Sequence, residues 1–230
     1  MNPDRQTEYV PALGFHWLTP LYDLAVRLTT RERRFKSALI EQAVIMPGHQ
    51  VLDLACGTGT LAIWIKKRYP EAIVTGLDGD PRMLEIARTK AHKAGVDVDF
   101  RQGFSTNLPF ANHSFDRAMS SLFFHHLNWQ DKQITVQELW RVLDPDGELH
   151  VADWGKADNL LMRSLFLVIQ CLDGFDNTGD NVRGRLIELF EGGGFRTALE
   201  QRTFPTVLGT MTLYSARPER AVPEQTADDP

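Results

Sequence analysis

Hydrophobic and polar positions divide the first two thirds of the chain into short apolar runs separated by longer mixed segments. Short apolar runs are typical of strands buried on both faces, and mixed segments that end at Gly or Pro are typical of helices. The predicted strands span residues 50–55, 73–78, 96–102, 114–121 and 148–153. The predicted helices span residues 18–28, 31–45, 61–69, 81–94 and 131–143. This alternation predicts a doubly wound, mainly parallel α/β sheet with helices on both faces.

Capping and turn residues mark some of the boundaries. Asp80 can cap the helix 81–94, Pro81 suits its first position, and Gly95 suits its C-terminal cap. The run Asp-Pro-Asp-Gly at residues 144–147 predicts a turn before the fifth strand.

The last third of the chain follows a different pattern. Two helical segments, 159–172 and 182–191, precede two strands, 195–203 and 207–216, with a short connection around Pro205. Adjacent strands predict an antiparallel hairpin at the edge of the sheet, which then has seven strands.

The chain has 230 residues, enough for one α/β domain of ordinary size. We expect that domain to span residues 48–216, after an N-terminal helical cap (1–47) and before a disordered tail (217–230).

Charge narrows the choice of partners. The formal net charge of −5 argues against general nucleic-acid binding, which usually needs a basic surface. Arg31, Arg33, Arg34 and Lys36 form a local basic cluster. This cluster fits a solvated helix face, and it also fits a basic surface that contacts an anionic substrate or a lipid headgroup.

The two cysteines, Cys56 and Cys171, suggest neither a disulfide framework nor a metal site. The N-terminus lacks the basic and apolar regions of a signal peptide. The most apolar window, 160–172, contains Arg163 and is too short to cross a bilayer. These features predict a cytoplasmic protein without a metal and without stable membrane insertion.

The strongest local signal is VLDLACGTGT at residues 51–60, a Gly-rich turn between a predicted strand and a predicted helix. Small residues are needed where a ligand lies against the backbone. Asp78 ends the next strand, and the carboxyl ends of adjacent strands meet at the ligand crevice of a doubly wound sheet. A carboxylate there can accept hydrogen bonds from ribose hydroxyls, so the pattern predicts a nucleotide-type cofactor.

Two cofactor classes fit this turn. Gly57, Gly59 and Ala62 match the dinucleotide pattern G-x-G-x-x-A, with an acid about 20 residues further on. Asp53 argues against a dinucleotide, because that fold keeps apolar residues in its first strand and an acid repels a pyrophosphate. The same acid suits the positive amino group of a methionine moiety, either directly or by orienting the backbone.

Four ordered motifs extend the match over about 100 residues, an ordinary length for the core of one domain. They are VLDLACGTGT (51–60), GLDGDPRMLEIAR (76–88), LPFANHSFDRAMSSLFFHHL (108–127) and ELWRVLDPDGELHVADW (138–154). With these motifs, residues 50–153 resemble the class I S-adenosylmethionine (SAM)-dependent methyltransferases. The resemblance is strongest to the small-molecule group that includes the ubiquinone/menaquinone C-methyltransferases. It implies a Rossmann-like sheet with a helical lid.

The resemblance also implies a SAM site. Its implied residues are Asp53, Ala55, Cys56, Gly57, Gly59, Asp78, Gly79, Met83, Gly103, Phe104, Ser105 and Ser120. Asp53 and the Gly-rich turn would hold the methionine end, Asp78 would bind the ribose, and Ser120 would lie under the sulfonium.

One position departs from the family. After the third strand the family often has Gly-Asp-Ala, whose acid contacts the adenine amine, whereas this chain has Gly103-Phe104-Ser105. Phe104 would stack on the adenine instead, with Ser105 as the polar contact.

Catalysis of methyl transfer needs positioning above all, and a general base only if the acceptor loses a proton. Candidates are His125 and His126 after the fourth strand, Asp153 after the fifth, and Tyr22 in an aromatic N-terminal segment. Each histidine also fits a purely structural role at a strand–helix junction. Trp154 fits either the acceptor pocket or the core.

The sequence therefore predicts a SAM-dependent methyltransferase that acts on a small, partly hydrophobic molecule. The aromatic N-terminus and the apolar segment 160–172 would suit such an acceptor. The alternatives are an NAD-dependent oxidoreductase and a SAM-binding partner protein without catalysis.

Overall fold

The computed structural model of the chain describes residues 32–156, 164, 166 and 175–218. Tyr22, the predicted helix 18–28, most of the predicted helix 159–172 and the residues after 218 lie outside the described residues.

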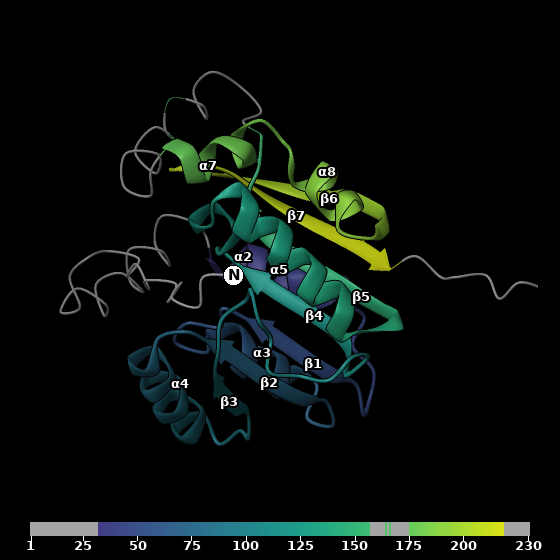
Figure 1. The fold of residues 1–230 in the computed structure, drawn as a ribbon. Coiled ribbons are helices and arrows are strands. Elements are labelled where there is room, and N and C mark those ends of the chain that lie inside the picture. The colour runs from purple at the N-terminus through teal and green to yellow at the C-terminus, as the bar shows by residue number, and fades with distance from the viewer. Residues whose placement is uncertain (1–31, 157–163, 165, 167–174, 219–230) are drawn as a thin grey trace, which may run out of the picture.

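The described strands form one seven-stranded sheet in the order β3-β2-β1-β4-β5-β7-β6 (Figure 1). Strands β1 to β5 pair in parallel, and β7 pairs antiparallel with both β5 and β6. The predicted parallel sheet with an antiparallel hairpin at its edge is confirmed. The strands are β1 Gln50–Leu54, β2 Ile73–Asp78, β3 Asp99–Gln102, β4 Phe115–Ser121, β5 Leu143–Trp154, β6 Phe195–Thr206 and β7 Gly209–Pro218.

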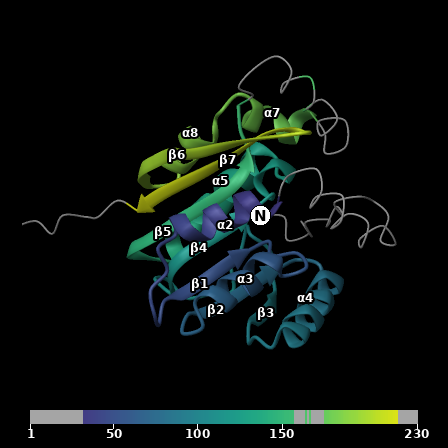
Figure 2. The same cartoon turned by 180° about the vertical axis from the view of Figure 1, so that it is seen from behind.

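Helices cover both faces of this sheet. The described helices are α2 Glu32–Gln42, α3 Thr60–Arg68, α4 Pro81–Ala94, α5 Trp129–Val142, α7 Phe175–Val182, α8 Leu186–Gly192 and the 3-10 helix η2 Phe124–His126. Helices α2, α3 and α4 lie on one face, and α5 and α8 lie on the other (Figures 1 and 2). Apolar side chains fill both interfaces: Phe35 and Ile65 belong to the first core, and Leu139 and Phe190 to the second.

The caps of α4 are confirmed. The backbone N–H of Arg82 donates to Asp80 Oδ1 at 2.9 Å, and Gly95 adopts the left-handed conformation with φ of 66°. Asp80 thus begins the helix, and Gly95 ends it where the chain turns toward β3, because Gly accepts positive φ at little cost.

Two boundaries in the last third were predicted wrongly. Instead of one helix over 182–191, the chain forms α7 and α8, and Gly184 with φ of 73° lies between them. The hairpin turns after Thr206 rather than around Pro205, which pairs with Thr210 inside β6. Pro is tolerated there because β6 is an edge strand. Strand β7 continues to Pro218, so it includes the first residues of the predicted tail.

The predicted turn at residues 144–147 lies within the bounds of β5. Leu143 pairs with Phe115, and pairing resumes at Glu148 with Arg117. The extra residues on β5 form an irregularity in the register. The residues on both sides of 144–147 pair with β4. The strand β5 therefore begins at Leu143, before the predicted turn, rather than after it.

Strands β2 and β3 extend the sheet from one side of β1, whereas β4 and β5 extend it from the other, so the strand order reverses beside β1. Ligands of doubly wound sheets bind outside the carboxyl ends of the strands at such a reversal. Leu54 and Ser120, which pair near the ends of β1 and β4, mark this edge.

Candidate functional site

The Gly-rich turn after β1 exposes backbone at the reversal point. Ala55, Gly57 and Gly59 all have positive φ, at 54°, 53° and 73°. A Cβ added to Gly59 would lie 2.8 Å from the Phe100 ring, so packing requires glycine there. A Cβ added to Gly57 would meet no atom within 4 Å. The turn therefore presents open space at Gly57, where a ligand can lie against the backbone.

Asp78 joins the end of β2 to this turn. Its Oδ2 accepts from the Gly57 N–H at 2.7 Å and its Oδ1 from the Asp80 N–H at 2.9 Å. Burial raises the pKa of Asp78, and these backbone donors oppose the rise. A carboxylate offers about four acceptor positions. Asp78 can therefore keep its backbone bonds and still has acceptor capacity for ligand hydroxyl groups.

Asp53 lies underneath the turn. Its side chain is 1% exposed and its Oδ2 accepts from the Ala62 N–H at 3.0 Å, in the first turn of α3. Burial raises the pKa of Asp53 to about 7, against the opposing effect of Lys36. This geometry fits the second of the two predicted roles, in which Asp53 orients the backbone that a ligand contacts.

An aromatic surface lies beside Asp78. Phe104 is 42% exposed, and its ring lies 3.1 Å from the position of a Cβ on Gly79. Ser105 points elsewhere, because its Oγ hydrogen-bonds to Thr135 Oγ1 at 2.8 Å on α5. Of this predicted pair, Phe104 offers an exposed ring to a flat ligand, and Ser105 joins the turn after β3 to α5.

The remaining predicted cofactor residues surround the same edge. Gly103 N–H donates to Asp78 O at 3.1 Å, and Met83 is half-buried on the first turns of α4. Ser120 is fully buried and its Oγ donates to Leu54 O at 3.1 Å, which ties β4 to β1. Burial raises the pKa of the Cys56 thiol well above its ordinary value, so Cys56 is a poor nucleophile.

A buried His–Asp pair lies at the carboxyl ends of β4 and β5. His125 Nδ1 is 2.8 Å from Asp153 Oδ1, and the two side chains are 3% and 0% exposed. Burial alone would raise the pKa of Asp153, but His125 and the backbone donors outweigh it and lower that pKa. The other groups that donate to the carboxylate are Phe123 N, Phe124 N, Trp154 N and Asn181 Nδ2.

The two predicted histidines differ in their surroundings. The His126 ring lies 4.0 Å from the His125 ring, centroid to centroid. Burial and the neighbouring His125 lower the pKa of His126 to about 3, so it stays neutral at physiological pH. His125 contacts the Asp153 carboxylate directly through Nδ1. Tyr22, the predicted lid residue, lies outside the described residues.

Trp154 belongs to the core. It is 2% exposed and its ring packs against Phe166 at 5.5 Å between centroids.

Two polar residues of the site region were not predicted from the sequence. Asn181 on α7 reaches Asp153, and the fully buried Lys132 on α5 bonds to Asn177 O at 2.6 Å and lies 3.6 Å from Asp180 Oδ2. No motif marks either residue, because both act through contacts between elements far apart in the sequence: Asn181 joins α7 to β5 and Lys132 joins α5 to α7.

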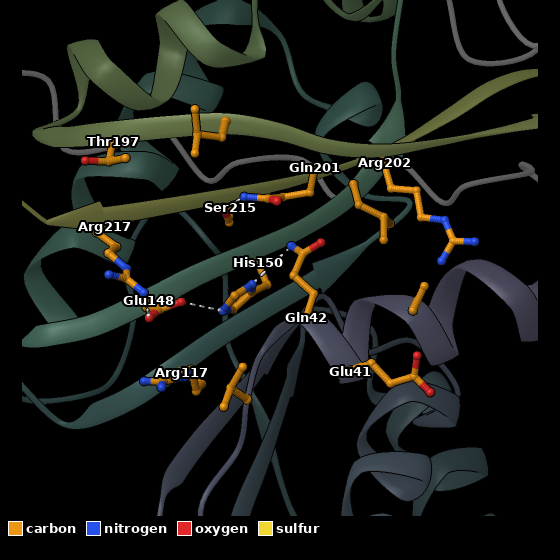
Figure 3. Close-up of a pocket in the computed structure, with 14 residues that line it drawn as sticks. Glu41, Gln42, Arg117, Glu148, His150, Thr197, Gln201, Arg202, Ser215 and Arg217 are labelled. Atoms are coloured by element: carbon orange, nitrogen blue, oxygen red, sulfur yellow. Dashed lines mark hydrogen bonds and ion pairs between the residues drawn. The ribbon is translucent and has the colours of Figure 1, made fainter.

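A separate groove of about 770 Å³ lies between α2 and strands β5, β7 and β6 (Figure 3). His150 lies on its floor, where Nδ1 is 3.1 Å from Gln42 Nε2 and Nε2 is 3.3 Å from Glu148 Oε2. Arg217 pairs with the same carboxylate. These contacts tie α2 to the sheet, so His150 serves a structural role.

Within the described residues, no group of His, Cys, Asp and Glu side chains could hold a metal ion. Among the helices that the structure describes, none is long and apolar enough to cross a membrane.

The fold and the turn–Asp78 arrangement define a class of protein that binds a nucleoside cofactor at the carboxyl edge of its sheet. A family model described as "Methyltransferase domain" matches residues 51–147. The chain is 30% identical over 234 residues to the ubiquinone/menaquinone biosynthesis C-methyltransferase UbiE of Syntrophotalea carbinolica, covering 94% of this chain and 97% of that protein. The chain therefore belongs to the class I SAM-dependent methyltransferases, whose cofactor is SAM. This membership excludes the NAD-dependent alternative.

Two further matches agree with it. The demethylmenaquinone methyltransferase of Thermus thermophilus is 37% identical over 142 residues, which cover 61% of this chain and 64% of that protein. The matched region thus spans slightly less than two thirds of the Thermus protein. A SAM-dependent methyltransferase from Aquifex aeolicus has the same fold, with a TM-score of 0.62 at 18% identity over 84% of this chain and 92% of that one.

Proposed function

We propose that this chain transfers a methyl group from SAM to a small, partly apolar molecule with a hydroxylated aromatic ring, and that His125 accepts the hydroxyl proton. The observation that carries the proposal is the buried His125–Asp153 pair at the carboxyl ends of β4 and β5. This pair lies on the same edge of the sheet as the Gly-rich turn and Asp78, because those residues follow the parallel strands β1 and β2.

The residues at the turn fit SAM. Gly57 leaves open space for the methionine end, Asp78 retains acceptor positions for ribose hydroxyls, and Phe104 offers an aromatic face for the adenine. The cofactor supplies, when bound, an electrophilic methyl group on a sulfonium whose sulfur leaves as a neutral thioether. The chain's remaining tasks are to orient the acceptor, exclude water and take up a proton.

His125 is suited to take up that proton. An ionised Asp153 can only accept, so Nδ1 of His125 carries the hydrogen and the lone pair lies on Nε2. When Nε2 takes the acceptor's hydroxyl proton, Asp153 stabilises the resulting imidazolium. Loss of that proton raises electron density on the ring, which makes a ring carbon nucleophilic enough to attack the methyl group. The methylated carbon then loses its ring hydrogen as a proton while the oxygen regains one, which restores the aromatic hydroxylated ring and frees His125 of its proton.

The choice of acceptor rests on the relatives. The Syntrophotalea protein is named for ubiquinone and menaquinone biosynthesis and for methylation at carbon, and the Thermus protein for demethylmenaquinone. A reduced quinone ring is a hydroxylated aromatic molecule of the proposed kind. We place the reaction in the cytoplasm with no nucleic-acid substrate, as composition and net charge predict.

The test combines an acceptor panel with variants of the base. Purified protein is incubated with methyl-labelled SAM and, in parallel, a reduced demethylated naphthoquinone, a simple phenol, tRNA and a peptide pool. The proposal predicts labelled product from the quinol and a fall in kcat of about 10²–10⁴-fold for His125→Gln. Label only in tRNA or peptide would overturn the acceptor class. An unchanged kcat in His125→Gln would overturn the base, and SAM binding without any product would favour a non-catalytic partner protein.

A further inference from the structure

Helix α7 is attached to the rest of the chain by polar contacts on two sides. On one side Lys132 of α5 bonds to Asn177 O and pairs with Asp180. On the other side Asn181 reaches the end of β5. The Lys132 contacts hold the helix in place, whereas the Asn181 contact reaches the carboxylate that orients His125.

Asn181 is fully buried, and its amide nitrogen bridges two acceptors. Nδ2 donates to Asp153 Oδ1 at 3.2 Å and to Trp154 O at 3.1 Å. Asp153 Oδ1 is the same oxygen that lies 2.8 Å from His125 Nδ1. Turning the amide over would place Oδ1 against two acceptors, so the contacts fix its orientation. Asn181 Oδ1 is itself buried without a hydrogen-bond partner among the described residues.

We infer that Asn181 is a positioning residue for the His125–Asp153 pair, and this inference rests on the proposed function. Backbone N–H groups of Phe123, Phe124 and Trp154 also donate to this carboxylate. Asn181 adds a side-chain donor on Oδ1, the oxygen that contacts His125, and so helps to keep that oxygen against the imidazole. A neutral donor does this without adding a charge that would compete with His125 for the carboxylate. A buried acceptor atom left unpartnered is costly, and its retention is consistent with a side chain selected for its Nδ2 bonds.

A purely structural role predicts something different. If Asn181 served only to dock α7, any change that loosens α7 would lower activity in the same way. Asp180→Asn provides that matched control, because it removes the ion pair with Lys132 and leaves Asp153 untouched. Arg185→Gln is a milder control, because Arg185, at the start of α8 and partly exposed, pairs with Asp180 of α7.

The experiment measures kcat, KM for SAM and the pH profile of four variants after thermal unfolding confirms that each is folded. We expect Asn181→Leu, which is similar in size and cannot donate, to lower kcat about tenfold with little change in KM for SAM. The two control variants should keep the wild-type kcat. In Asn181→Asp the introduced carboxyl can donate to Asp153 only when protonated, so its activity relative to wild type should rise as pH falls.

Three outcomes would overturn the inference: a wild-type kcat in Asn181→Leu, an equal loss in Asp180→Asn, or a pH-independent loss in Asn181→Asp. Failure of the proposed function is seen separately. If His125→Gln keeps full activity, the base itself is wrongly assigned, whatever Asn181 does. If His125→Gln is inactive and Asn181→Leu is not, only the positioning role fails.

Discussion

Gly57 and Asp78 are joined by a 2.7 Å hydrogen bond from the glycine N–H to the carboxylate, across the carboxyl ends of neighbouring strands. This bond ties the Gly-rich turn after β1 to the end of β2. At this joined pair, Gly57 provides backbone with open space above it, and Asp78 provides a carboxylate that can accept from hydroxyl groups.

Replacing Asp78 should weaken cofactor binding. Asp78→Ala removes bonds to ligand hydroxyls that are each worth roughly 1.5–3 kcal/mol, so the Kd for S-adenosylhomocysteine should rise at least about tenfold. Asp99→Ala is the control, because Asp99 is an exposed carboxylate on the next strand and pairs with Arg101. Calorimetric titration measures both variants, and an unchanged Kd in Asp78→Ala would refute the ribose contact.

Alanine at the two glycines of the turn should affect fold stability and cofactor binding differently. Gly59→Ala places a Cβ 2.8 Å from the Phe100 ring at a positive φ, so it should destabilise the fold. Gly57→Ala pays only the backbone cost of positive φ, about 1–2 kcal/mol, because nothing lies near its Cβ. Thermal unfolding and titration should therefore find Gly57→Ala folded but defective in cofactor binding. Strong cofactor binding by Gly57→Ala would place the ligand elsewhere.

Phe104 should contribute to cofactor affinity through its ring. Phe104→Ala should weaken binding of S-adenosylhomocysteine by roughly 0.5–1.5 kcal/mol, the range for aromatic pairs. Phe104→Trp keeps an aromatic face and should retain most of the affinity. Equal affinities for wild type and Phe104→Ala would show that the adenine does not contact this ring.

Asp53 should make stability depend on pH. Its folded-state pKa of about 7 lies above the unfolded value, so between about pH 4 and pH 7 the folded state binds more protons. Its contribution to stability is therefore present at low pH and is lost as pH rises toward 7. Asp53→Asn removes this titration, and its stability relative to wild type should increase between pH 5 and pH 8 in denaturant titrations. A pH-independent difference between the two proteins would contradict the raised pKa.

The order and type of the central elements could be predicted from the sequence because each carries its own local signal. Asp80, Pro81 and Gly95 mark both ends of α4, and β2 has the predicted bounds. The last third could not be placed as well, because its boundaries depend on tertiary contacts. Pro205 looks like a turn residue and lies inside β6, where the sheet edge leaves its missing N–H without consequence.

The candidate site also contains residues that the sequence could predict and residues that it could not. The Gly-rich turn and Asp78 have fixed spacing along the chain and were predicted, whereas the Asn181–Asp153 bond joins α7 to β5 without any motif. Sequence reasoning also treated His125 and His126 alike. The structure distinguishes them by their surroundings in the 3-10 turn η2: His125 Nδ1 lies 2.8 Å from Asp153 Oδ1, and burial lowers the pKa of His126.

The most direct test of the account is calorimetric titration of the purified chain with S-adenosylhomocysteine and, in parallel, with NAD. The account predicts saturable binding of S-adenosylhomocysteine in the range of about 1 μM to 1 mM and no heat from NAD. Binding of NAD without binding of S-adenosylhomocysteine would contradict it, because the turn at Gly57 and Asp78 would then serve a different cofactor.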